Sequence, residues 1–247
     1  MGQNFLQDAN IAGKIVRALE IQPADSILEI GPGAGALTGI VLEQTPARLV
    51  LVEKDRHWAG ERMRAGEGKV SVVLADALLF PWERFHKPWK FLGNLPYNVA
   101  SPLIWNLLSL ASGLTKAVFM VQKEVGVRLA AGPGEDAYGA LSVWVQSFSR
   151  PRLEFFVPPQ VFFPRPKVDS AVLSFVPARG GIETFSPSAL ARTLHACFQK
   201  RRKQLGTTVR AAGGDTRQLE ALDIDPGLRP GALTVEAFHL LSLSGIF

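Results

Sequence analysis

The chain has 247 residues, of which 47% are hydrophobic, and it carries a net charge of +5. This length suffices for one large domain or for a larger domain with a small second one, and no apolar run is long enough to span a membrane. The single cysteine excludes an internal disulfide and favours a reducing compartment, so we expect a cytoplasmic protein with no membrane partner. The four histidines are scattered, none at ligand spacing with a cysteine or another histidine, so we predict no metal site.

The first half of the chain alternates between helical and strand-like patterns. Ile11, Ile15 and Leu19 share one face of an opening helix. We expect strands at residues 26–30, 48–55, 69–76, 90–94 and 115–122, and further helices at 36–44, 56–64, 101–110 and 123–131. Ser101 and Pro102 suit the cap and the first turn of the helix in which they occur. Nearly apolar strands that alternate with helices predict a parallel sheet covered on both faces.

The second half of the chain changes in character. Residues 152–159 and 170–177 are typical of strands and are expected to form an antiparallel edge of the sheet. Residues 177–188 are rich in Gly, Pro and Ser and predict a linker. Short helices are expected at 187–198, 201–212, 216–222 and 234–243. We therefore predict an α/β protein with a sheet domain over residues 1–178 and a small all-α domain over residues 184–247.

Four predicted strands in succession end in residues that are unusual for a core. Gly31–Gly35 follow the first strand, Glu53 and Asp76 end the next two, and Asn94 ends the fourth. Ligands of parallel α/β sheets bind beyond the carboxyl ends of the strands. The coincidence of four such ends predicts a ligand site at this edge of the sheet.

The segment EIGPGAG is the first part of this predicted site. Glycines at 31, 33 and 35 allow a tight turn and a close approach of the backbone to a ligand, although a purely structural turn has the same composition. The spacing differs from the dinucleotide motif G-x-G-x-x-G and from the phosphate loop. No basic residue lies in or next to the glycine loop to meet a pyrophosphate, which argues against NAD and ATP.

The two carboxylates give the site its predicted specificity. Glu53 stands about twenty residues after the glycines, where a carboxylate can accept both hydroxyl protons of a ribose. Asp76 could accept from an exocyclic adenine amine, although either carboxylate alone is more often a helix cap. Together with the glycines they predict a pocket for a nucleoside without phosphates, and S-adenosyl-L-methionine is the cofactor that suits it.

The C-terminal part of the chain is basic. Residues 184–214 contain no Asp or Glu but include a cluster of four cations, Lys200, Arg201, Arg202 and Lys203. A solvated helix face and a nucleic-acid contact are both consistent with this cluster taken alone.

The segment NLPYN, after the fourth strand, is an (Asn/Asp/Ser)-x-Pro-(Tyr/Phe) motif of methyltransferases that act on exocyclic amines. With GQNFL, EIGPGAGALT, VQKEV, YGALSV and VFFPRPKVDSAV in this order, most of the chain resembles the ribosomal RNA adenine N6-dimethyltransferase family of KsgA type. The resemblance implies a Rossmann-like S-adenosylmethionine-dependent methyltransferase sheet. It also implies dimethylation of two adjacent adenosines near the 3′ end of 16S rRNA, on an immature 30S particle, and we expect a monomer.

The chemistry of an adenine amine explains the residue types of NLPYN. The amine is a poor nucleophile because its lone pair is delocalised into the ring. Hydrogen bonds to the Asn94 side-chain oxygen and to a backbone carbonyl, assigned here to Leu95, would favour a nucleophilic nitrogen. Pro96 would keep these acceptors aimed, and Tyr97 would stack on the flipped base.

The resemblance implies further roles. Phe162 corresponds to the aromatic residue that sandwiches the adenine from its other side. Lys167 and the trailing helical domain, with the basic cluster at 200–203, would contact RNA. Cofactor-binding residues implied by the family or by the pattern above are Gln3, Asn4, Leu6, Gly31, Gly33, Glu53, Asp76 and Asn94.

The sequence departs from the family in three places. It begins at the methionine before GQNFL, where relatives usually carry a basic segment. Ala140 stands where an arginine is common, and the C-terminal pattern is looser. Three alternatives stay open: a large-subunit rRNA methyltransferase of the macrolide-resistance type, a DNA adenine methyltransferase, and a non-catalytic ribosome-assembly factor. FPRPKVDS and the bulk of the tail argue against the first, and no target-recognition insertion supports the second.

Overall fold

A computed structural model describes residues 4–66, 68–178 and 185–247. The chain divides into two compact units, one made of Met1–Val127 with Pro151–Pro177 and the other of Arg128–Arg150 with Ala178–Phe247. None of the described helices is both long enough and apolar enough to cross a membrane. The domain boundary predicted between residues 178 and 184 stays a prediction, and residues 179–184 lie outside the described part of the chain.

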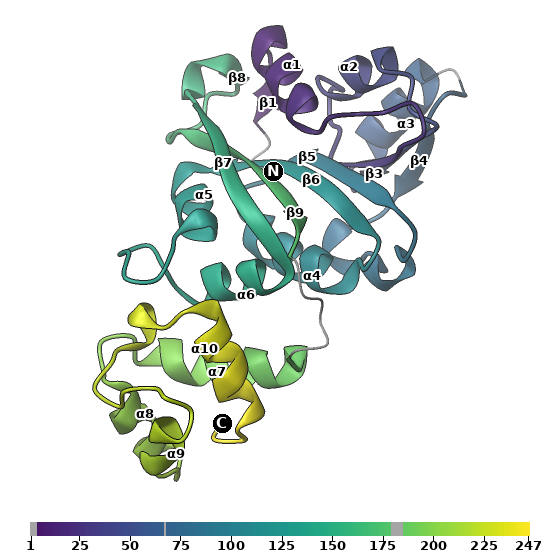
Figure 1. The fold of residues 1–247 in the computed structure, drawn as a ribbon. Coiled ribbons are helices and arrows are strands. Elements are labelled where there is room, and N and C mark those ends of the chain that lie inside the picture. The colour runs from purple at the N-terminus through teal and green to yellow at the C-terminus, as the bar shows by residue number, and fades with distance from the viewer. Residues whose placement is uncertain (1–3, 67, 179–184) are drawn as a thin grey trace. The chain divides into compact units, whose positions relative to one another are not determined.

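A seven-stranded sheet organises the fold (Figure 1). Its strands, in spatial order, are β4 (Ser71–Leu74), β3 (Arg48–Glu53), β2 (Ser26–Ile30), β5 (Trp89–Asn94), β6 (Leu114–Gln122), β9 (Ser170–Pro177) and β7 (Ser149–Val157). The pairs from β4 to β6 are parallel, and β9 pairs antiparallel with β6. The predicted parallel sheet with an antiparallel addition is confirmed.

Helices cover this sheet on both faces, as the apolar strands predict. Figure 1 shows α1 (Ala9–Ala18), α2 (Thr38–Glu43) and α3 (Arg56–Ala65) on one side and α4 (Ala100–Leu110) on the other. The remaining elements around the sheet are α5 (Lys123–Ala130) and the 3₁₀ turns η1 (Ala77–Leu79), η2 (Trp82–Arg84) and η3 (Pro159–Val161).

The core explains why these segments form the elements that they do. Ile15 and Leu19 of the opening helical face are fully buried, and they belong to one cluster with Leu51 and Leu92 of the sheet. Burying such side chains contributes roughly 1.5–3 kcal/mol each relative to leaving them exposed. The Asp8 side chain caps α1 by accepting from the Ile11 backbone N–H at 3.0 Å.

Two local features differ from the sequence prediction. Ser101 lies inside α4 and is not its cap; the cap position is Val99 and it has no side-chain hydrogen bond. The first backbone N–H groups of α4, those of Val99 and Ala100, are satisfied by the Pro96 carbonyl at 3.0 and 3.1 Å. In addition, β1 (Phe5–Leu6) and β8 (Phe162–Phe163) form a two-stranded antiparallel sheet that was not predicted.

The second unit is mainly helical. It contains α6 (Ala140–Phe148), α7 (Pro187–Gln199), α8 (Leu205–Ala211), α9 (Arg217–Glu220), η5 (Pro230–Ala232) and α10 (Val235–Leu243). Leu190, Leu194 and Phe238 are buried there, and the Tyr138 hydroxyl donates to the Leu233 carbonyl at 2.9 Å. The helix expected from residue 201 begins at Leu205 instead, after a turn over residues 200–203.

Candidate functional site

A cavity of ≈ 500 Å³ opens at the carboxyl ends of β2, β3 and β5, and its volume suits a small-molecule ligand. Most of the predicted site residues line it together. These are Asn4, Leu6, Gly31, Gly33, Glu53, Asp76, Asn94, Leu95 and Tyr97. They come from five separate segments of the chain, and the parallel sheet brings them to one edge.

The glycine loop forms one wall of the cavity. Gly33 has φ +49°, in the left-handed region where side chains are strained. A Cβ atom added to it would also lie 3.0 Å from the Phe5 ring. Glycine at this position therefore lets the N-terminal strand pack directly against the loop. Phe5 lines the cavity too, although the sequence analysis named only its neighbours Asn4 and Leu6.

Glu53 is held at the end of β3 with a fixed orientation. Its side chain is 3% exposed. One carboxylate oxygen accepts from the Gly33 N–H at 3.1 Å, and the other accepts from the Asp55 N–H at 2.9 Å. Each carboxylate oxygen can accept more than one hydrogen bond, so both retain capacity to accept from a ligand hydroxyl.

Asp76 ends the loop after β4 and has two protein partners. Its Oδ1 atom accepts from the Leu78 N–H at 3.0 Å, which caps η1, and its Oδ2 atom pairs with Lys54 Nζ at 2.7 Å. The hydrogen bond from Lys54 is the main reason why the pKa of Asp76 is lowered. Lys54 and Arg56 also line the cavity. These cations were not predicted from the sequence, because they lie about twenty residues after the glycine loop.

Glu29 is a further acid at the cavity that the sequence analysis did not name. It belongs to EIGPGAG, is 2% exposed, and accepts from the Thr38 hydroxyl at 2.7 Å. Burial is the main reason why its pKa is raised to about 7; the hydrogen bond from Thr38 and the charge of Arg62 oppose this shift, and Glu53 adds to it. A carboxylate within an otherwise apolar strand is the signal that could have identified it.

The corner after β5 presents a hydrogen-bond acceptor to the cavity. The Asn94 amide donates from Nδ2 to the backbone carbonyl of Asn4 at 3.1 Å, which leaves its Oδ1 atom as an acceptor. The Leu95 N–H donates to the Met120 carbonyl at 3.0 Å, and the Pro96 carbonyl accepts the first N–H groups of α4. The corner is therefore bonded to the residue before β1, to β6 and to the start of α4.

Tyr97 adds an aromatic ring beside this acceptor. The ring lines the cavity, and its hydroxyl shares a 2.8 Å hydrogen bond with the Ser170 hydroxyl at the start of β9. Burial raises the pKa of Tyr97, so the phenol stays neutral near pH 7 and this hydrogen bond persists. An aromatic face next to a hydrogen-bond acceptor is an arrangement that can hold a nucleobase.

Some predicted residues do not line the cavity. Phe162 is 4% exposed and packs in the core cluster with Leu6, its partner across the β1–β8 pair. Lys167 is exposed outside the cavity, and the basic cluster at 200–203 is exposed in the second unit, where Arg201 donates to the Asp136 carbonyl. Gln3 lies outside the described residues. Over the described ranges there is no group of three metal-ligating side chains.

Comparison with known sequences decides the family. The family described as "Ribosomal RNA adenine dimethylase" matches residues 1–243 of the chain. The chain belongs to this family. A relative from Nitratidesulfovibrio vulgaris, strain Hildenborough, named "Ribosomal RNA small subunit methyltransferase A", is 55% identical over 98% of this chain and 93% of its own length. A relative of the same name from Oleidesulfovibrio alaskensis is 53% identical over 98% and 89% of the two chains.

Solved structures agree with this membership. A dimethyladenosine transferase from Plasmodium falciparum is similar with a TM-score of 0.84 at 26% identity, covering 96% of this chain and 95% of its own. The 23S rRNA methyltransferase ErmE has a TM-score of 0.73 at 22% identity over 98% and 99% of the two chains, which supports the fold alone. The Rossmann-like methyltransferase fold predicted from the sequence is therefore confirmed.

Proposed function

We propose that this chain is an S-adenosylmethionine-dependent RNA methyltransferase that dimethylates the N6 amines of two adjacent adenosines near the 3′ end of 16S rRNA. The observation that carries the proposal is that the Asn94–Tyr97 corner shares one cavity with Glu53 and Asp76. Membership of the ribosomal RNA adenine dimethylase family supports it, as do relatives named for the small ribosomal subunit. The substrate would be an immature 30S particle in the cytoplasm. The enzyme would bind it as a monomer.

The donor and acceptor groups of the cavity fit S-adenosylmethionine. The buried Glu53 carboxylate would accept from the ribose hydroxyls, and Asp76 from the adenine amine. Asn4, Leu6 and the glycine loop would enclose the rest of the cofactor, and Gln3 is proposed with them from the resemblance. Of the two cations in the lining, Lys54 already pairs with Asp76 at 2.7 Å. When bound, the cofactor supplies a methyl group that is already activated by its sulfonium.

The chain itself would position the target amine. Asn94 Oδ1 would accept one proton of the amine, and the Leu95 carbonyl would accept the other, which favours a pyramidal and nucleophilic nitrogen. The Asn94 amide is suited to this role because its Nδ2 group is already bonded to the Asn4 carbonyl at 3.1 Å. Alignment of this kind contributes through proximity and orientation and does not require a strong general base.

Aromatic and basic residues would hold the RNA. The Tyr97 ring would stack on the flipped adenine. Phe162 would cover the other face, as the family pattern implies; because it is 4% exposed, its ring must become accessible when the base enters. Lys167 and the basic cluster at 200–203 would contact phosphates.

Replacement of Asn94 by Ala tests the proposed site. We expect methyl transfer to unmethylated small-subunit particles to fall by about a hundredfold or more, in line with the loss of one preorganised hydrogen bond to a reacting group. Thermal stability, measured by calorimetry, should change little. Asn106→Ala on α4, which lies outside the cavity, is the matched amide control. Normal transfer by Asn94→Ala would remove Asn94 from the mechanism.

A further inference from the structure

Residues 163–168, which run from the last residue of β8 toward the start of β9, form a segment that we call the rim segment, and all of them except Pro166 are exposed. Phe163 is 67% exposed and Val168 is 44% exposed. Arg165 and Lys167 are exposed as well, and within the described part of the chain neither forms an ion pair. Exposed aromatic rings and cations together are the groups with which proteins bind single-stranded nucleic acid.

Both ends of the rim segment are attached to the wall of the cavity. Phe163 pairs across the small sheet with Phe5, which lines the cavity. Two residues after Val168, the Ser170 hydroxyl bonds with Tyr97, which also lines the cavity, at 2.8 Å. The rim segment therefore borders the place where the target base would enter, although Phe163 itself is not part of the cavity lining.

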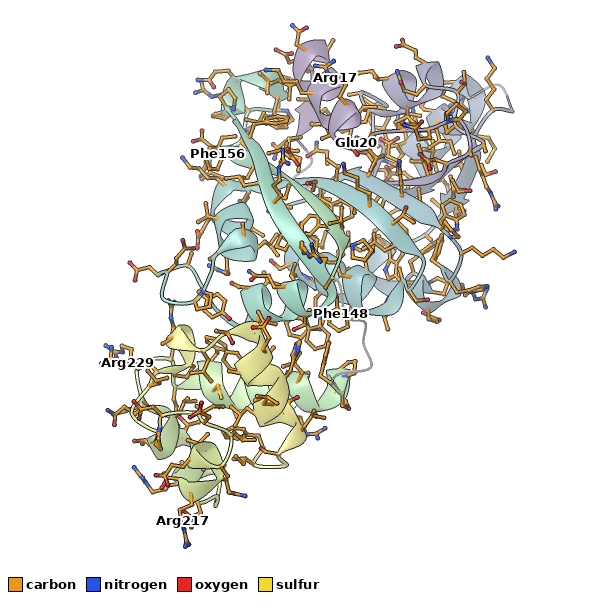
Figure 2. The ribbon with its side chains drawn as sticks, viewed as in Figure 1. Arg17, Glu20, Phe148, Phe156, Arg217 and Arg229 are labelled. Atoms are coloured by element: carbon orange, nitrogen blue, oxygen red, sulfur yellow. The ribbon has the colours of Figure 1, made fainter. Side chains whose placement is uncertain are left out.

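Phe163 differs from the other exposed phenylalanine of this region. Phe156 on β7, which Figure 2 labels, has the ammonium group of Lys123 over its ring, 5.0 Å from the ring centre. That same ammonium pairs with Asp169 at 3.2 Å. By contrast, no ring or cation among the described residues contacts the Phe163 ring in this way. One face of Phe163 is thus open to a planar partner, whereas Phe156 already has a cation over its ring.

From this arrangement we propose that the rim segment is a binding site for one unpaired nucleotide of the RNA that flanks the target adenosine. Phe163 stacks on the base of this nucleotide, and Arg165 binds its phosphate. The site rests on the proposed function, because it requires an RNA substrate. Stacking on an aromatic ring is tolerant of base identity, and guanidinium groups bind phosphate with paired hydrogen bonds, so this subsite holds the strand without reading its sequence.

The first test compares RNA affinity among three variants. The probe is a single-stranded small-subunit RNA fragment that contains the two adjacent adenosines, and binding is measured by fluorescence anisotropy. Phe163→Ala should weaken binding by about tenfold, because one base–aromatic stack is removed. Phe163→Trp should restore it. Phe156→Ala removes an equal ring whose face is covered, and it should change affinity by less than about twofold. An equal loss in both alanine variants would overturn the proposal.

The second test separates stacking from charge. Phe163→Ala should leave the slope of log affinity against log salt unchanged, because stacking releases no counterions. Arg165→Gln should reduce the slope by about one. A reduced slope in Phe163→Ala would show that the ring acts by placing a phosphate contact, and it would contradict the stacking role.

The third test identifies the nucleotide. An abasic nucleotide is placed on either side of the adenosine pair, and each RNA is bound to the wild type and to Phe163→Ala. At one of the two positions, the abasic RNA should bind the wild type about tenfold more weakly than the intact RNA does. Phe163→Ala should bind this abasic RNA no more weakly than the wild type does, because the stack is already lost. Additive losses at both positions, with methyl transfer by the wild type intact, would overturn this inference alone. Absence of methyl transfer by the wild type would instead count against the proposed function.

Discussion

At the scale of single residues, the orientation of one amide determines what the cavity offers. The Asn94 amide group donates to the Asn4 carbonyl at 3.1 Å, so its oxygen is the end left for a substrate. The sequence predicted Asn94 from the motif that contains it. It could not predict the partner, because the two residues stand 90 positions apart and meet only when β1 reaches the end of β5.

Glu29 gives a prediction about stability and pH. Burial raises its pKa from 4.5 to about 7 in the folded protein. Between pH 4.5 and pH 7 the Glu29 carboxyl keeps its proton in the folded chain and releases it in the unfolded chain. The free energy of unfolding therefore falls as the pH rises through this range, and this group causes no further change above it. Its full effect is about 3 kcal/mol. The glutamine of Glu29→Gln does not titrate. As the pH rises from 4.5 to 8, the free energy of unfolding of this variant should therefore increase by about 3 kcal/mol relative to that of the wild type.

Urea unfolding of both proteins across this range measures the difference. Glu43→Gln, which replaces an exposed carboxylate on α2, is the matched control. A stability difference between Glu29→Gln and wild type that does not change with pH would contradict the buried-acid description.

The residues that could not be predicted or placed from the sequence are those whose position depends on tertiary contacts. The sequence around Phe162 is consistent both with a ring that faces a ligand and with a ring in the core. In the structure Phe162 pairs with Leu6 across β1 and β8 and is 4% exposed. Lys54 and Arg56 follow Glu53 directly, yet their place in the lining depends on how β3 ends. Their residue types carry no signal of that position.

At the scale of elements, the strands and helices of the sheet were predictable because short strand-like runs alternate with helical segments along the chain. β1 and β8 have only two residues each, and their pairing across the chain leaves no local pattern. The predicted start of α4 was wrong because Ser101 and Pro102 are residue types that favour the cap and the first turn of a helix. The Pro96 carbonyl satisfies the helix instead, so the motif corner and the helix start are one structure.

The turn between α7 and α8 carries the prediction that belongs to this scale. Lys200, Arg201, Arg202 and Lys203 are all exposed there. Replacing the four by glutamine should flatten the salt dependence of RNA binding, by about 0.7 to 0.9 in log–log slope for each RNA phosphate that the variant no longer neutralises. The matched control replaces Lys14 and Arg17 on the exposed face of α1. A slope equal to that of the wild type would assign the cluster to an ordinary solvated surface.

At the scale of the whole molecule, the parallel order of β4, β3, β2 and β5 explains the convergence of the site. Their carboxyl ends carry Asp76 in the following loop, Glu53, the glycine loop and Asn94, and all of these line one cavity. The sequence predicted this convergence because parallel strands place their ends on the same edge. The sequence did not predict that Arg128–Arg150 belongs to the same compact unit as the C-terminal residues, because this depends on packing between segments far apart in the chain.

We propose above that this protein dimethylates adenosine in small-subunit RNA, and the product nucleosides test this proposal most directly. Unmethylated small and large ribosomal subunits are incubated separately with the protein and S-adenosylmethionine, and the nucleosides of each RNA are then separated and weighed by mass spectrometry. We predict N6,N6-dimethyladenosine at two neighbouring positions of the small-subunit RNA, and no methylated product in the large-subunit RNA. Only N6-monomethyladenosine, or a product confined to the large-subunit RNA, would contradict it.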